Sequence, residues 1–149
     1  MKQSHQIYFR VAEGLAGCQQ VEFELKNYLA GAMELAKKCI GGKMPFHTSA
    51  KDFEKCSLER LTNHFKNYSN DSELLSALKK FTDERNFLAH QALATLKDPE
   101  GNFDDSEIMN LHTRLDNVEP EAKRLANAIY SSAQTIWSQV WFDDLTEKE

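Results

Sequence analysis

The chain has 149 residues, the size of one ordinary domain, and is long enough to bury a hydrophobic core without disulfides or a structural metal. Hydrophobic residues make up 41% and charged residues 28%, a composition that excludes a disordered or fibrous polymer. The formal net charge of −5 argues against a protein that coats nucleic acid through a broad basic surface, so any nucleic-acid contact must be local.

Few residues in the chain favour turns. Glycine occurs six times and proline three times, whereas a β-sandwich or barrel needs many turns, so we expect a few long helices. No apolar run approaches the roughly 18 residues of a membrane span, and the N-terminal sequence lacks the apolar segment of a secretory signal. We therefore expect a single domain over residues 1–149, cytoplasmic and without membrane contact. Cys18, Cys39 and Cys56 lack metal-binding spacing, and we expect reduced thiols packed as small apolar groups.

The first predicted element is one long helix over residues 5–40. The segment contains no proline, and one side of the helix carries a seam that alternates spacings of four and three. The seam residues are Val11, Leu15, Cys18, Glu22, Leu25, Leu29, Ala32, Ala36 and Cys39. Gly41 and Gly42 can enter left-handed geometry and should end the helix, while Lys37 and Lys38 complement the negative charge of its last turn.

Two shorter helices should follow an irregular connection over residues 43–56. Ser57 can cap a helix that carries Leu58, Leu61 and Phe65. Turn-forming residues at 67–72 then precede a third helix, which Asp71 or Ser72 can cap and which should continue to residue 96, before the loop at 97–105. Its seam consists of Leu74, Leu78, Phe81, Arg85, Leu88 and Ala92.

The last segment keeps one apolar phase from residue 108 to residue 136, although Pro120 lies in its middle. Because the phase survives the proline, we expect one long helix with a kink. The first and last helices would each have about 35 residues, or roughly 50 Å, and would run antiparallel with the two shorter helices between them. The fold class that follows is all-α, an up-and-down bundle of four or five helices with two long outer helices.

Residues 84–90 carry the polar groups that the bundle pattern does not explain. Asn86 and His90 are four residues apart and share a face of the helix. Arg85 occupies the apolar seam, where an unpaired charge is costly. Spacing alone is compatible with a structural ion pair or with an arginine whose charged end reaches water.

The run Arg85-Asn86-Phe87-Leu88-Ala89-His90 resembles the signature of the HEPN (higher eukaryotes and prokaryotes nucleotide-binding) superfamily. In that family an arginine and a small polar residue precede a histidine on one helix of a four- or five-helix bundle. The resemblance implies a metal-independent endoribonuclease of toxin–antitoxin or antiphage systems, whose site forms where two copies meet. It implies an RNA substrate, a homodimer, a cognate antitoxin as a further partner, and no cofactor.

The resemblance also implies the roles of the motif residues. His90 and its copy would act as base and acid, Arg85 would stabilise the phosphate, and Asn86 would orient His90 or donate to the phosphate. Ala92 stands where the branch paired with nucleotidyltransferase antitoxins has tyrosine, so the resemblance does not extend to that branch. Members without activity serve as assembly modules, and a non-catalytic helical dimerisation module is the alternative function.

Other polar residues could support this site. Glu22 could pair with Arg85 across the core or turn to water, and Glu84 precedes the motif. Lys79 and Lys80 could attract phosphates or form a solvated face. The remaining histidines, His5, His47, His64 and His112, are scattered and lack partner spacing, and Trp137, Trp141 and Phe142 are typical of packing or dimerisation. No motif of P-loop, serine-hydrolase or zinc-protease chemistry occurs in the sequence.

Overall fold

The computed structural model describes residues 2–142, with the side chains of residues 5–142, and these residues form an all-α bundle. Four α-helices dominate, and two short 3₁₀ turns interrupt the connections between them. The elements are α1 (Lys2–Ile40), η1 (Ala50–Phe53), α2 (Leu58–Phe65), α3 (Ser72–His90), η2 (Ala94–Leu96) and α4 (Asp105–Phe142). Within residues 2–142 there is no β-strand, and the only β-type pairing is a single bridge between Lys97 and Phe103.

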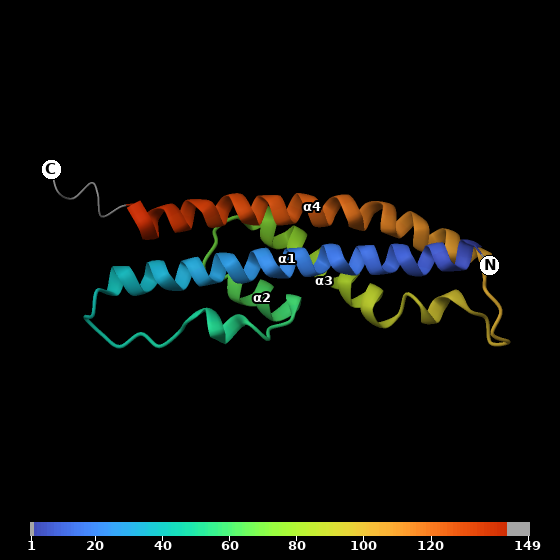
Figure 1. The fold of residues 1–149 in the computed structure, drawn as a ribbon, viewed down its shortest axis with the longest axis horizontal. Helices are drawn as coiled ribbons and strands as arrows, with labels where there is room; N and C mark the ends of the chain where they lie inside the picture. Colours follow the sequence, from blue (N-terminus) through green and yellow to red (C-terminus); the bar gives the residue numbers. More distant parts are fainter. Residues whose placement is uncertain (1, 143–149) are drawn as a thin grey trace.

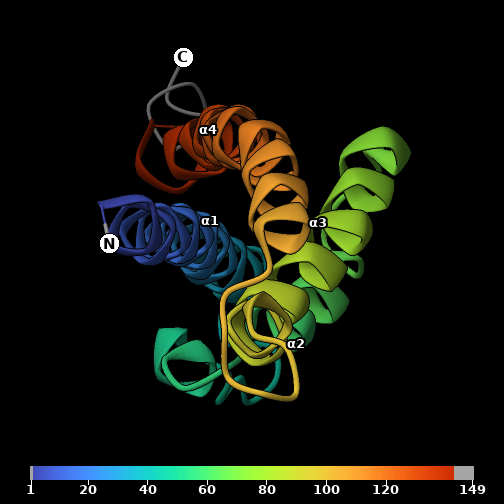
Figure 2. The ribbon, with the colours of Figure 1, turned by 90° about the vertical axis from the view of Figure 1, so that its right-hand side faces the viewer.

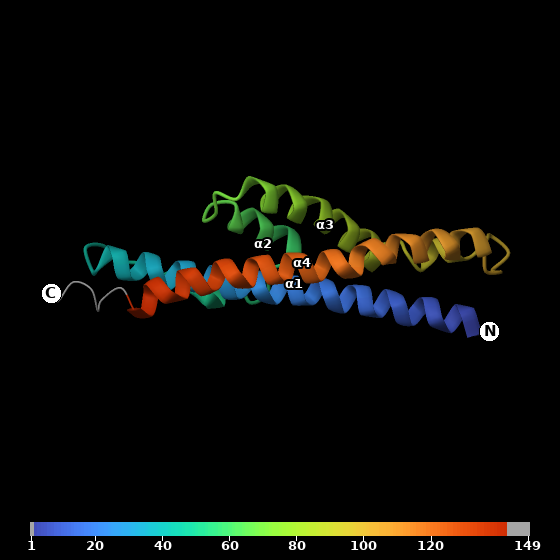
Figure 3. The same cartoon turned by 90° about the horizontal axis from the view of Figure 1, so that it is seen from above.

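The two long helices pack directly against each other, and α2 and α3 lie along one side of the pair (Figure 3). Seen end-on in Figure 2, the first half of α3 stands away from α1 and α4. The shared core is almost completely closed to solvent, with Leu25 and Leu29 of α1 and Leu115, Leu125 and Ile129 of α4 all at 0% exposure. Each such side chain contributes roughly 1.5–3 kcal/mol by leaving water, which holds the long helices together along their length.

The expected antiparallel orientation of the long helices was wrong, because α1 and α4 run parallel (Figure 1). Arg10, near the start of α1, contacts His112 near the start of α4. At the other end, Lys38 Nζ donates to the carbonyl oxygens of Gln139 and Val140, at 2.9 and 3.0 Å.

The reason is an additional pass of the chain along the bundle. Residues 41–57 turn back beside α1, where Lys26 Nζ donates to the carbonyl oxygen of Glu54 and where Phe53 and Cys56 are buried. The prediction counted only the changes of direction between successive helices and therefore omitted this pass. With four reversals instead of three, α4 has the same direction as α1.

The predicted helix ends agree with the structure at most positions. Gly41 and Gly42 have φ values of 59° and 80°, a left-handed conformation that ends α1. Ser57 and Asp71 cap α2 and α3, accepting hydrogen bonds from the backbone N–H groups of Arg60 and Leu74. α4 continues through Pro120 as one helix, as its apolar phase predicts.

Two expectations were wrong, one about the end of the third helix and one about the burial of Cys39. The third helix ends at His90 and does not continue to residue 96, because the N–H groups of Gln91 and Ala92 both bond the carbonyl oxygen of Phe87 and close the last turn. The chain then turns so that Leu96 is buried in the 3₁₀ segment. Cys39 is exposed at the end of α1, whereas Cys18 and Cys56 are buried as expected, and none of the three is in a disulfide. In the described residues, no helix has the length and apolar character needed to cross a membrane.

Candidate functional site

The second half of α3 places the motif residues beside α1. The helix buries Leu78, Phe81 and Leu88 in the core, and this fixes the rotation of α3 about its axis. Arg85 lies between those apolar positions, and His90 is the last residue of the helix. The motif therefore begins on the core-facing side of α3 and ends at its open C-terminal end.

Arg85 is held by a carboxylate from α1. Its Nε lies 3.8 Å from Glu22 Oε1, and its NH1 group donates to Asn86 Oδ1 at 3.4 Å. The exposed fractions of the two ion-paired side chains are 28% for Arg85 and 18% for Glu22, so the charges are partly shielded from water. Of the two alternatives for Glu22, the structure has the pair with Arg85, which explains how a charge sits on an apolar seam.

A thiol lies close to this ion pair. Cys18 precedes Glu22 by one turn of α1 and is 1% exposed. Burial raises the pKa of Cys18 to about 11, while Arg85 lowers it and Glu22 raises it. Such a thiol is protonated at neutral pH and is not a nucleophile. The four-residue spacing of Cys18 and Glu22 in the sequence was the signal for this neighbour.

His90 is separate from the other two motif residues. It is exposed, and within the described residues no hydrogen bond or ion pair joins it to Arg85 or Asn86. Asn86 is half-buried and lines a groove of about 490 Å³ between α2 and α3, together with Lys79. One chain therefore presents a coupled Arg85–Asn86 pair and, one turn later, an imidazole that is open to a ligand or partner.

The remaining predicted residues do not converge on this place. Lys80 lines a different groove of about 910 Å³ between α3 and α4, which adjoins the groove of Lys79 at Ser76 and Asp83. Glu84 also lines that groove, where it accepts two hydrogen bonds from Arg114, at 2.6 and 3.0 Å. The Arg114 guanidinium in turn lies 3.5 Å from the centre of the Phe87 ring. Glu84 thus fastens α3 to α4 through Arg114.

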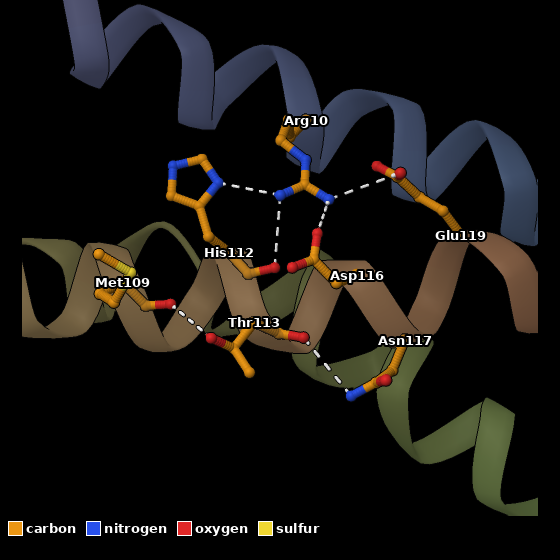
Figure 4. A network of polar contacts seen from close by, with 7 residues as sticks. All are labelled: Arg10, Met109, His112, Thr113, Asp116, Asn117 and Glu119. Carbon is orange, nitrogen blue, oxygen red and sulfur yellow. Dashed lines mark hydrogen bonds and ion pairs between the residues drawn. The ribbon is translucent and has the colours of Figure 1, made fainter.

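A second polar network, which the sequence analysis missed, joins the first halves of α1 and α4 (Figure 4). Arg10 directs one guanidinium nitrogen to His112, reaching Nδ1 at 3.0 Å and the carbonyl oxygen at 3.3 Å. The other terminal nitrogen lies 2.8 Å from Asp116 and 3.5 Å from Glu119. Burial lowers the pKa of Arg10, but hydrogen bonds and charge attraction from the two carboxylates outweigh it, so the net pKa is raised.

His112 is half-buried and its partner in this network is Arg10 of the other long helix, which agrees with the lack of partner spacing near it in the sequence. Asp116 and Glu119 follow it by four and seven residues, which places all three side chains on one face of α4. That periodicity was the available signal. The partner, Arg10, is 102 residues away from His112, and its contact depends on the parallel packing of α1 and α4. Because Arg10 of α1 faces Asp116 and Glu119 of α4, the network fastens the two helices together.

Among the described residues, no group of three or more His, Cys, Asp or Glu side chains is placed to hold a metal ion. Comparison of the chain with protein-family models, with curated proteins and with solved structures finds no match. The case for a function therefore depends on the residues themselves.

Proposed function

We propose that this chain is a metal-independent endoribonuclease of the HEPN type, acting in the cytoplasm as a toxin or antiphage enzyme. The observation that supports the proposal is the arrangement at the end of α3, where an exposed His90 follows the coupled Arg85–Asn86 pair by one turn. An imidazole is the side chain best suited to move protons near neutral pH, and an arginine about one turn away on the same helix suits a phosphate.

The proposed reaction uses the 2′-hydroxyl of the RNA as the nucleophile. One imidazole takes the proton of that hydroxyl while the 2′-oxygen bonds to phosphorus. The bond from phosphorus to the 5′-oxygen breaks, and a second imidazole supplies the proton that this oxygen needs. The products are a 2′,3′-cyclic phosphate and a 5′-hydroxyl, and no water or metal enters this step. Arg85 stabilises the negative charge that gathers on the phosphate oxygens.

Two copies are needed because the motif of one chain contains a single histidine. A two-fold axis beside the end of α3 would bring His90 of one copy to the phosphate from one side and His90 of the other from the opposite side. Leu93, three residues beyond His90, is 43% exposed and offers apolar surface for such a contact. In this proposal Glu22 is a positioning residue that holds Arg85 at the edge of the site.

The test is cleavage of single-stranded RNA in the presence of a chelator. We expect the wild-type protein to leave 2′,3′-cyclic phosphate ends and His90→Ala to lose at least about a hundredfold in rate, since general acid–base catalysis contributes roughly 10²–10⁴-fold. His47→Ala is the matched control, because His47 is also exposed but lies in the connection before α2. Circular dichroism should show the same helical content in all three proteins. Intact RNA with the wild type, or equal cleavage by His90→Ala, would contradict the proposal.

A non-catalytic dimerisation module is the second candidate. It is favoured by the engagement of Arg85 with Glu22 and Asn86, which is also what a structural ion pair would show. This alternative predicts a dimer by light scattering that leaves RNA intact. A monomer at working concentration would remove the composite site and with it the catalytic proposal.

A further inference from the structure

A second groove, of about 690 Å³, lies between α1 and α4 and is separate from the α3 motif. Its charged lining is mainly acidic, with Glu13 and Glu24 from α1, Glu119 from α4, and Lys123 as the cation. Arg10 also lies 3.5 Å from Glu119, so three carboxylates face two cations and an excess of negative charge remains.

Two carboxylate oxygens in this groove are buried without a hydrogen-bond partner among the protein groups. Glu24 is only 7% exposed, and its Oε1 accepts from Gln20 Nε2 at 3.1 Å while its Oε2 has no partner. Glu119 Oε1 is also buried without a partner, although the whole side chain is 36% exposed and its Oε2 faces Arg10 at 3.5 Å. In the described part of the chain only one further side-chain atom, Thr62 Oγ1, is buried in this way.

These oxygens indicate the chemistry of a ligand. A buried carboxylate oxygen without a donor is unfavourable by roughly 1–3 kcal/mol or more. Both oxygens are closed to solvent, so a donor in the groove reaches them when the carboxylate turns towards it, and that turn relieves the cost. The donor should be cationic, because the surrounding charge is negative. Glu24 and Glu119 thus form two acceptor points, one from each helix, that a positively charged ligand would satisfy.

The geometry favours an ammonium group over a guanidinium or a metal ion. A guanidinium gains its advantage over an ammonium when its fork meets both oxygens of one carboxylate, but Gln20 occupies one oxygen of Glu24 and Arg10 faces one oxygen of Glu119. A metal ion needs several ligands around one point, and the described residues provide no group of three. An ammonium can donate to a single remaining oxygen.

The two acceptor points lie too far apart for one cation. A Cβ added at Gly17 would be 3.0 Å from Ala122 Cβ, so these two positions are level across the parallel helices. Glu24 follows Gly17 by seven residues and Glu119 precedes Ala122 by three, which separates the two glutamates by about 15 Å along the axis at 1.5 Å per residue.

Between the two points the groove is lined by small side chains, among them Ala16, Gly17, Ala122 and Ala126. Such a surface leaves room for an aliphatic chain to lie along the helices. We propose that this groove binds a linear aliphatic polyamine, with one ammonium at Glu24, another at Glu119 and the methylene chain over the small residues. Lysine side chains of a partner protein have the same chemistry, and the test separates these two sources.

The experiment is calorimetric titration of the full chain with spermidine at about 0.15 M salt, where exposed charges more than about 8 Å apart are largely screened. Glu24→Gln and Glu119→Gln should each weaken binding at least tenfold. Glu34→Gln, which removes an exposed carboxylate elsewhere on α1, should leave it unchanged. Butylamine, which has one ammonium, should bind at least tenfold more weakly than spermidine. Backbone amide shifts in nuclear magnetic resonance should concentrate at Gly17, Ala122 and their neighbours.

Thermal melting gives a second measurement, because a ligand that binds only the folded chain raises its stability by an amount set by its concentration and affinity. Spermidine should raise the melting temperature of the wild type and of Glu34→Gln more than that of Glu24→Gln. Equal binding by all variants would show unspecific charge attraction and would overturn the proposal. Binding of a lysine-containing peptide without binding of spermidine would also overturn it, by assigning the groove to a partner's side chain.

Discussion

At the scale of single residues, Cys18 shows how the core changes the chemistry of a thiol. Burial raises its pKa from 9.0 to about 11 in the folded chain, so the protonated thiol favours folding. That contribution is complete below about pH 9 and is lost as the pH rises through about 11, because the unfolded chain releases the proton first. We expect the wild type to lose about 2 kcal/mol more unfolding free energy than Cys18→Ala between pH 8 and pH 11.

Urea unfolding at several pH values measures this difference. Tyr28, whose pKa burial also raises, is present in both proteins, so the comparison isolates Cys18. Cys39→Ala is the control, and because that thiol is exposed, it should follow the wild type. Parallel pH profiles for the wild type and Cys18→Ala would show that the thiol ionises equally in both states.

At the scale of elements, the contact of α1 with α4 is tight at Gly17. An added Cβ would lie 3.0 Å from Ala122 Cβ, an atom fixed to the backbone of α4 that no side-chain rotation can move. Gly17→Ala gains up to about 1 kcal/mol in helix propensity, but overpacking typically costs roughly 1–3 kcal/mol. We expect a net loss of about 1 kcal/mol in unfolding free energy, measured by urea denaturation.

Gly14→Ala is the matched comparison on the same helix. There the new Cβ would meet Leu115 Cδ2 at 3.0 Å, and this is the far end of a flexible side chain that can shift. The gain in helix propensity should then offset most of the cost, so Gly14→Ala should be less destabilising than Gly17→Ala. The reverse order would mean that the two long helices can separate slightly without loss.

At the scale of the whole molecule, the parallel direction of α1 and α4 can be measured in solution. Spin labels at Glu34 and Ser138, both exposed, lie near the C-terminal ends of the two helices. Parallel packing predicts a separation on the order of 20 Å, since the two helix axes are about 10 Å apart and the labels add length. An antiparallel pair would separate the sites by more than about 40 Å along the axis. Pulsed electron resonance, with Cys39 replaced by Ser, distinguishes the two arrangements.

A distance above 40 Å would contradict the topology together with the contacts that depend on it. Those contacts are the Arg10–His112 network at one end of the pair and the hydrogen bonds of Lys38 at the other. A matched pair of labels at Glu13 and Asn117, near the opposite end, should also give a short distance.

The amino-acid sequence by itself determined the local features of this protein. The spacing of apolar residues predicted two long helices and two short ones, Gly41 and Gly42 marked the end of α1, and Asp71 marked the start of α3. Continuity of α4 through Pro120 followed from the phase of its apolar seam. Such features depend on neighbours within a few residues, so they can be read along the chain.

Tertiary structure alone decided the direction of α4 and the partners of the charged residues. The direction depends on a connection that packs against α1 through Phe53, and no helical period records such a pass. The same packing brings Arg10 to His112 and forms the groove between α1 and α4 that Glu24 lines. Within the motif, the sequence placed Arg85, Asn86 and His90 on one helix, but only the packing of α3 on α1 gave Arg85 its contact with Glu22 and left His90 exposed. Contacts between residues far apart in the chain depend on how whole helices are oriented, and that orientation is set by the complete core.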